Sequence, residues 1–211
     1  MSEGIRRTVG IVIFDDVEVL DFSGPFEVFS VTRTGVGSAP DAISPYAVHL
    51  IGESGDMITA AGGMQVLPHA SFDTCPPIDV LVIPGGWGTR AQLDNPVMRE
   101  FLRDRSANVS LLTSVCTGSL LLGQAGLLEG RRATTHWQAL DLMTEMFPAV
   151  RVDRDHHVVE DGDIFTSAGI SAGIDMALRV VARQLGESVA RETARQMEYP
   201  YPESDRRRIE F

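Results

Sequence analysis

Residues 109–125, VSLLTSVCTGSLLLGQA, contain the turn on which both the fold and the site depend. The first seven residues are mostly apolar, as in a strand buried on both faces of a parallel sheet. A helix is predicted to begin directly afterwards, at Thr117, and to run to about residue 125. Cys116 is therefore expected on a tight strand-to-helix turn, at the edge of the sheet where open α/β folds bind their ligands.

The rest of the chain repeats this alternation of strand and helix, which predicts an α/β fold: a doubly wound, mostly parallel sheet of the flavodoxin-like kind with helices on both faces. No linker or internal repeat interrupts it, so one domain is expected over residues 1–211. The other expected strands cover residues 8–14, 46–51 and 79–83, with hairpins over 57–67 and 158–165. The other expected helices run from Pro25 towards residue 32 and over 96–105, 174–185 and 188–197, and residues 33–45 are expected to form a loop.

Composition excludes several classes of protein. A formal net charge of −11 argues against a nucleic-acid partner, because binding to phosphates needs a surplus of Lys and Arg. The three arginines at 206–208 are expected in a solvated tail. No secretory signal and no stretch of about 20 apolar residues is present, so neither membrane insertion nor secretion is expected. Two cysteines make no disulfide framework, and a cytoplasmic location is the default.

Cys116 is a candidate nucleophile. At a helix N-terminus, unpaired N–H groups and the helix dipole are expected to lower the pKa of its thiol. Gly85 and Gly86, which follow the preceding strand, could provide half of an oxyanion hole, and Thr117 the other half. The alternative is a buried structural cysteine, the commoner role of a free thiol. Cys75, in a loop with no helix N-terminus of its own, is expected to be inert.

Five ordered motifs resemble the ThiJ/PfpI superfamily, whose members are related to class I glutamine amidotransferase domains. The resemblance covers nearly the whole chain and implies the same fold. The motifs are residues 20–29 (LDFSGPFEVF), 83–86 (IPGG), 114–119 (SVCTGS), 126–137 (GLLEGRRATTHW) and 166–178 (TSAGISAGIDMAL).

Within this superfamily the sequence is most similar to the isonitrile hydratase group. The peptidase-like members have His directly after the cysteine, where this chain has Thr117. The Parkinsonism-associated members have Glu where this chain has Asp21. The resemblance implies that Cys116 adds to an isocyanide carbon and that Asp21 acts as general acid and base. Water then releases an N-substituted formamide. It also implies a homodimer, no cofactor, no metal, and a small molecule as substrate.

Other residues are candidates for the substrate site, each with a structural alternative. Trp87 is expected to line an apolar pocket, and His136 to form its wall or tune a pKa. The loop with Ile170 and Ser171 is expected to contact substrate. Asp175 resembles an acidic residue that the hydratases need, although an ordinary first-turn Asp is the alternative. Asp21 could likewise be a helix cap rather than a catalyst.

Two further functions stay open at this level. One is another thiol enzyme or stress protein of the superfamily, such as one that removes glyoxals. The other is a non-catalytic ligand-sensing module, because the same fold forms the sensor half of AraC-type regulators. Those regulators continue into a helix-turn-helix region for which this chain has no matching sequence.

Overall fold

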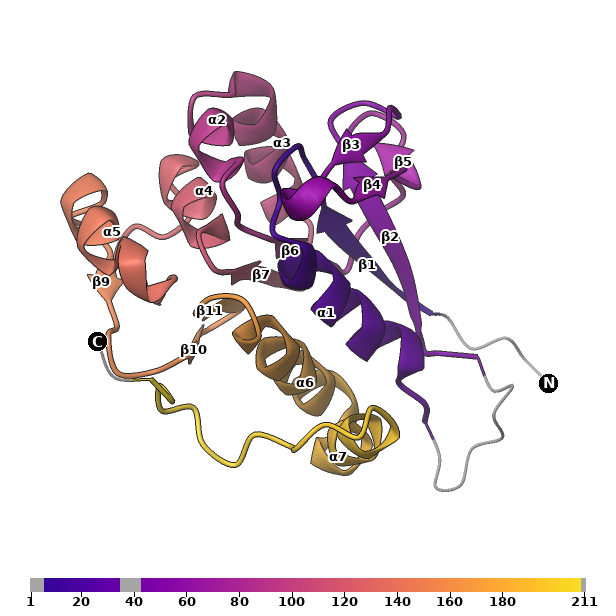
Figure 1. Cartoon of the computed structure of the whole chain (residues 1–211). Helices are drawn as coiled ribbons and strands as arrows, with labels where there is room; N and C mark the ends of the chain where they lie inside the picture. The colour runs from indigo at the N-terminus through magenta and orange to yellow at the C-terminus, as the bar shows by residue number, and fades with distance from the viewer. Residues whose placement is uncertain (1–5, 35–42, 210–211) are drawn as a thin grey trace.

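The computed structural model describes residues 6–34 and 43–209. Seven strands form the central sheet in the order β10-β11-β7-β6-β1-β2-β5 (Figure 1). All neighbours are parallel except β10 and β11, which form the expected antiparallel hairpin. The strands are β1 (Arg7–Val12), β2 (Tyr46–Gly52), β5 (Ala70–Ser71), β6 (Val80–Ile83), β7 (Leu111–Val115), β10 (Val158–Asp161) and β11 (Ile164–Ser167).

Helices cover both faces of this sheet. Helices α1 (Val19–Val31), α6 (Ala172–Leu185) and α7 (Glu187–Gln196) pack together on one face, and α2 (Thr89–Leu93), α3 (Pro96–Ser106) and α4 (Gly118–Gln124) lie on the other (Figure 1). Helix α5 (Leu140–Met146) lies towards the β10 end of the sheet (Figure 1). The fold class is therefore the mostly parallel, doubly wound sheet that the sequence predicts.

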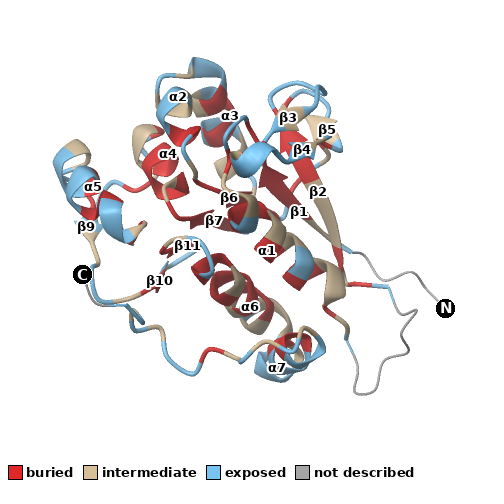
Figure 2. Ribbon diagram, viewed as in Figure 1, coloured by how far each residue is buried: buried red, intermediate tan, exposed pale blue. Residues whose placement is uncertain are grey.

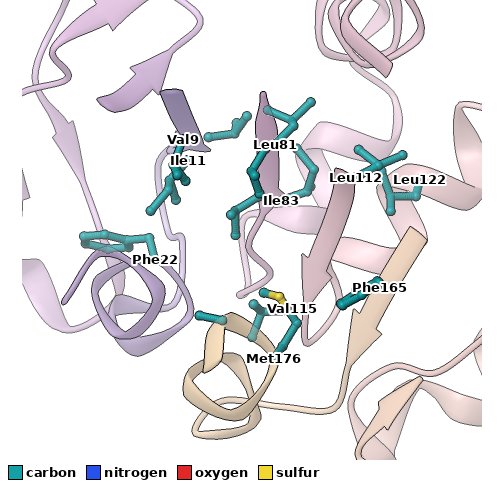
Figure 3. Close-up of a cluster of buried hydrophobic side chains, with 14 of the residues drawn as sticks. Val9, Ile11, Phe22, Leu81, Ile83, Leu112, Val115, Leu122, Phe165 and Met176 are labelled. Carbon is teal, nitrogen blue, oxygen red and sulfur yellow. The ribbon is translucent and has the colours of Figure 1, made fainter. Parts of the chain in front are cut away.

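The core lies between the sheet and its two helix layers. Strands β1, β6 and β7 are almost wholly buried (Figure 2). In Figure 3, Phe22 of α1 and Met176 of α6 approach the sheet from one side, and Leu122 of α4 approaches from the other. This apolar packing anchors the carboxyl ends of β1, β6 and β7, and those ends carry the site described below.

The expected start of the first helix is wrong. The helix begins at Val19, so Pro25 lies inside it instead of in its first turn. Proline lacks the N–H that would bond to the carbonyl four residues earlier, a cost that the packing of α1 against the sheet and α6 offsets. The consequence is that Asp21 lies within the first turn of α1, not before the helix.

Most short elements escape prediction because two to seven residues carry too little periodicity. These are β5, α2, α5 and the parallel pair β8 (Arg132–Ala133) and β9 (Arg151–Val152). The small hairpin of β3 (Ile58–Thr59) and β4 (Gln65–Val66) is as predicted. The expected loop over residues 33–45 lies partly outside the described residues. Among the helices that are described, none combines the length and apolar character needed to cross a membrane.

Candidate active site

Cys116 follows β7 directly and has a φ of 57°, in the left-handed region that residues with a side chain rarely adopt. Hydrogen bonds to its backbone N–H and to its carbonyl hold this conformation. The backbone N–H donates to the carbonyl oxygens of Ser167 and Ala168, each at 3.1 Å. The carbonyl oxygen accepts from Thr135 Oγ1 at 3.0 Å and Ser119 Oγ at 3.2 Å. Such strain of about 1–3 kcal/mol is typical of functional turns.

Asp21 joins this turn from the other half of the sheet. Its carboxyl is fully buried, and its Oδ2 accepts a hydrogen bond from the N–H of Gly85 at 2.9 Å. The same carboxyl interacts with the Cys116 thiol. Within the described part of the chain, Oδ1 has no hydrogen bond of ordinary geometry. Asp21 therefore faces the thiol and does not serve as a cap of α1.

Burial controls the protonation of Asp21. Loss of solvent raises the pKa of its carboxyl from 3.8 to about 8, against the hydrogen bond from Gly85, and the charge of Glu18 raises it further. The interaction with the thiol acts in the opposite direction. Asp21 is thus a carboxylic acid near neutral pH, able to donate a proton.

The expected lowering of the pKa of Cys116 is wrong for this structure. Burial of the thiol raises its pKa well above the ordinary value, and the negative charge of Asp21 raises it further. Interactions with the N–H and the hydroxyl of Thr117 favour the thiolate but are the smaller effects. Cys116 and Asp21 form a coupled acid pair, so a proton must move within the pair when the sulfur reacts.

Thr117 connects the cysteine turn to the loop after β6. Its hydroxyl accepts from the N–H of Gly86 at 3.1 Å and lies 2.9 Å from Thr89 Oγ1. The N–H groups of Gly85 and Gly86 are thus taken by Asp21 and Thr117. These two N–H groups therefore position the acid and the threonine, and they are not free to form the oxyanion half-site expected from the sequence. A side chain at Gly85 would collide with Thr117, because an added Cβ would lie 2.5 Å from its backbone nitrogen.

A cavity of about 240 Å³ opens over Cys116 and Thr117. Its apolar wall includes Trp87, Leu93, Leu120, Leu142 and Ile170, and its polar groups are Glu18, Arg90, His136 and Gln138. Trp87 is 70% exposed at the mouth of the cavity, with the Arg90 guanidinium 4.3 Å from the centre of its ring. The cavity can hold a small, largely apolar molecule with one end against the thiol.

The predicted substrate residues divide into two groups. Trp87, His136 and Ile170 line this cavity. Burial, together with the charge of Arg207, lowers the pKa of His136 and so favours its neutral ring. Ser171 and Asp175 instead border a separate cavity of about 90 Å³ behind the same loop. Asp175 is 1% exposed and is bonded to other side chains, so it does not reach Cys116 or its cavity.

Sequence reasoning missed Glu18, Thr89 and Arg90. Glu18 precedes α1 and acts on Asp21, and the other two come from the short helix α2. The position of Glu18, three residues before Asp21, was a weak sequence signal for its role. No local sequence pattern indicated Thr89 or Arg90. Cys75 is buried in its loop, and burial raises the pKa of its thiol. Across the described ranges, no three His, Cys, Asp or Glu side chains converge as metal ligands would.

The chain is similar to known proteins over most of its length. The profile of the DJ-1/PfpI family matches residues 7–183. The isonitrile hydratase of Pseudomonas putida is 39% identical over 198 residues, covering 93% of this chain and 81% of that enzyme. The HTH-type transcriptional regulator GbdR of Pseudomonas aeruginosa is 29% identical over 87% of this chain, which spans only 48% of the regulator. A crystal structure of a ThiJ/PfpI family protein from Pseudomonas syringae superposes with a TM-score of 0.81 at 32% identity, covering 95% of this chain and 78% of that one.

Proposed function

The chain belongs to the DJ-1/PfpI family, and from this premise we propose that it is an isonitrile hydratase that converts an isocyanide into an N-substituted formamide. The observation that carries the proposal is the pair of Cys116 and Asp21. The pair combines a buried thiol with a carboxylic acid that is protonated near neutral pH. Hydration of an isocyanide needs both groups, because its carbon must gain a proton and a nucleophile together.

In the first step, the sulfur of Cys116 bonds to the terminal carbon of the isocyanide. Asp21 delivers its proton to that carbon and takes up the proton of the thiol, so that the carboxyl is neutral again at the end of the step. The product is a thioimidate on Cys116 with one C–H bond and a C=N double bond. The transfer explains how a thiol that burial keeps protonated can act as a nucleophile.

In the second step, water adds to the thioimidate carbon while Asp21 relays a proton from the water to the nitrogen. The hydroxyl of the tetrahedral adduct then becomes the carbonyl of the formamide as the C–S bond breaks, and the proton of that hydroxyl passes to the sulfur. This step releases the formamide and restores both groups. The hydroxyl and the N–H of Thr117 stabilise the departing sulfur, which is the role supported by their effect on the thiol.

To test this proposal, the purified protein is incubated with cyclohexyl isocyanide, and N-cyclohexylformamide is measured by chromatography. The apolar wall of the cavity supports an uncharged cyclic substituent. We expect the rate of formamide formation to increase in proportion to the enzyme concentration. Absence of product with cyclohexyl, benzyl and tert-butyl isocyanides would overturn the function.

Thr117→Val should lower kcat about 10- to 100-fold, because the sulfur loses a hydroxyl donor. The change also leaves the N–H of Gly86 without its acceptor. The matched control is Thr117→Ser, which retains the hydroxyl and should keep most of the activity. Steady-state kinetics on the same isocyanide compare the two. Equal kcat values for the Val and Ser variants would contradict the role given to the hydroxyl.

A second candidate is a ligand-sensing module, supported by the similarity to GbdR over 87% of this chain. It requires tight binding of a small molecule with no dependence on Cys116. Calorimetry on Cys116→Ala in the isocyanide series separates this candidate from the enzyme. The homodimer, the single domain and the cytoplasmic location expected from the sequence remain predictions, which sedimentation, limited proteolysis and cell fractionation test.

A further inference from the structure

After α7, the described chain runs back along the molecule as far as residue 209. Residues 198–209, called here the C-terminal strap, pass α6 and reach the amino end of β10 (Figure 1). The N–H of His157 donates to the carbonyl of Asp205, and the N–H of Arg207 to that of Asp155. The solvated tail expected for the three arginines is wrong for Arg207 and Arg208, which are bonded to the body of the protein, whereas the side chain of Arg206 is exposed.

Asp175 is the anchor of this strap. Its Oδ2 lies 2.9 Å from His157 Nε2 and 2.8 Å from an Arg208 nitrogen, and its Oδ1 accepts from Tyr199 at 2.9 Å. Nδ1 of His157 bonds to the carbonyl of Arg206 at 2.8 Å. This carboxylate has three donors, one directly before β10 and two in the strap, and it joins segments that no other described side chain joins in this way. Its position in the first turn of α6 alone does not explain this arrangement.

Hydrogen bonds connect His157 and the strap to both sides of the Cys116 backbone. The carbonyl of His157 accepts from the N–H of Ala168 at 2.7 Å, and the carbonyl of Ala168 accepts from the N–H of Cys116. On the other side, Arg207 donates to Thr134 Oγ1 and to the carbonyl of Thr135, whose hydroxyl donates to the carbonyl of Cys116. The strap thus supports one of the two bonds on each side of Cys116, namely the bond to Ala168 and the bond from Thr135.

We propose that Asp175 is a positioning residue that fixes the reactive turn through the strap: by holding His157, Tyr199 and Arg208 together, it keeps the Cys116 sulfur against Asp21. Asp175 does not touch substrate. If its carboxylate is removed, the anchors of the Cys116 backbone loosen and φ relaxes from the left-handed region. The sulfur then moves away from the Asp21 carboxyl and towards solvent.

This proposal predicts a change in the reactivity of the thiol in protein that remains folded. Burial and the charge of Asp21 are what hold the thiol protonated, so its release should raise its reactivity towards a simple alkylating reagent. Catalysis should fall at the same time, because the sulfur and the acid no longer share one geometry. Unfolding would also expose the thiol and stop turnover, so both rates are measured well below the thermal transition of each variant, where only a local displacement of the sulfur changes them.

The experiment compares four proteins in a Cys75→Ala background, so that Cys116 is the only thiol: the parent, Asp175→Asn, Tyr199→Phe and Asp205→Asn. Asp205 is the matched control, because its carboxylate also lies in the strap but bonds to Arg179 at 2.7 Å and not to the anchor. Iodoacetamide alkylation, followed by intact mass, and isocyanide turnover are measured on each protein.

In Asp175→Asn we expect alkylation to be about tenfold faster and kcat to fall to about a tenth of the parent value or below. Tyr199→Phe should move both in the same directions by smaller factors, and it serves if Asp175→Asn does not fold. Asp205→Asn should stay within about twofold of the parent. Unchanged or slower alkylation in both anchor variants, or equal changes in Asp205→Asn, would overturn the proposal. Only the turnover measurement rests on the proposed function; if the parent lacks turnover, alkylation alone decides the positioning role.

Discussion

Cys116→Ala is expected to reduce isocyanide hydration about 10³-fold or more, to the rate without enzyme. The thioimidate cannot form without the sulfur, and Cys75, the other cysteine of the chain, does not line this cavity. Chromatographic measurement of the formamide at saturating isocyanide checks the loss. Mass spectrometry of the parent protein during turnover should show an adduct of one isocyanide on the peptide that carries Cys116.

Cys75→Ala is the matched control for this prediction. Cys75 is also a buried cysteine, but its sulfur bonds only to the carbonyl of Phe72 in a loop before β6. Turnover should stay within about threefold of the parent. The folded state of Cys116→Ala is verified by its thermal transition, since the bonds that hold residue 116 come from its backbone. Retained turnover in Cys116→Ala would exclude a covalent mechanism.

Asp21→Asn is expected to lower kcat about 10²- to 10⁴-fold, because an amide cannot deliver a proton to the isocyanide carbon. In the parent, the pKa of Asp21 at about 8 predicts that kcat/KM falls as pH rises through that value and the acid loses its proton. A pH profile from 5 to 10 measures the descending limb. A parent profile that is flat across pH 8 would contradict the role of Asp21 as the acid.

The same substitution should stabilise the protein above about pH 4. In the native state the pKa of Asp21 is raised to about 8, and in the unfolded chain it is 3.8, so the native state keeps a proton that the unfolded chain loses. The parent therefore loses stability as pH rises between these values, whereas Asn has no such loss and can still accept from Gly85. We expect a gain in unfolding free energy of roughly 3 kcal/mol at pH 9, below the full linkage of the shift.

Chemical denaturation at pH 4 and pH 9 measures this gain. The difference between Asp21→Asn and the parent should vanish near pH 4, where both states of the parent are protonated. Asp79→Asn is a suitable control, because Asp79 accepts from the N–H of Thr8 at an exposed position. A control that gains as much at pH 9 would attribute the effect to the reduced net charge and not to burial.

What the sequence determined by itself was the local architecture. The apolar run ending at Val115 and the glycine at 118 were enough to place Cys116 on a strand-to-helix turn. In the structure, an added Cβ at Gly118 would lie 2.0 Å from the carbonyl oxygen of Ile83. The Asp-Gly pair before Ile164 predicted the β10–β11 hairpin, where Gly162 has a φ of 66°. These features follow from steric rules that act over a few residues, so a linear pattern carries them.

Only the tertiary structure decided the chemistry of the turn. Asp21 lies 95 residues before Cys116. Whether it caps a helix or faces the thiol depends on the sheet order, in which β1 and β7 lie on opposite sides of β6. The raised pKa of the thiol comes from burial, which a helix N-terminus in the sequence does not reveal. Asp175 likewise bonds to Tyr199 and Arg208 because residues 198–209 fold back over α6. Long-range packing sets solvent exposure and hydrogen-bond partners, and these decide which groups are acids, nucleophiles or supports.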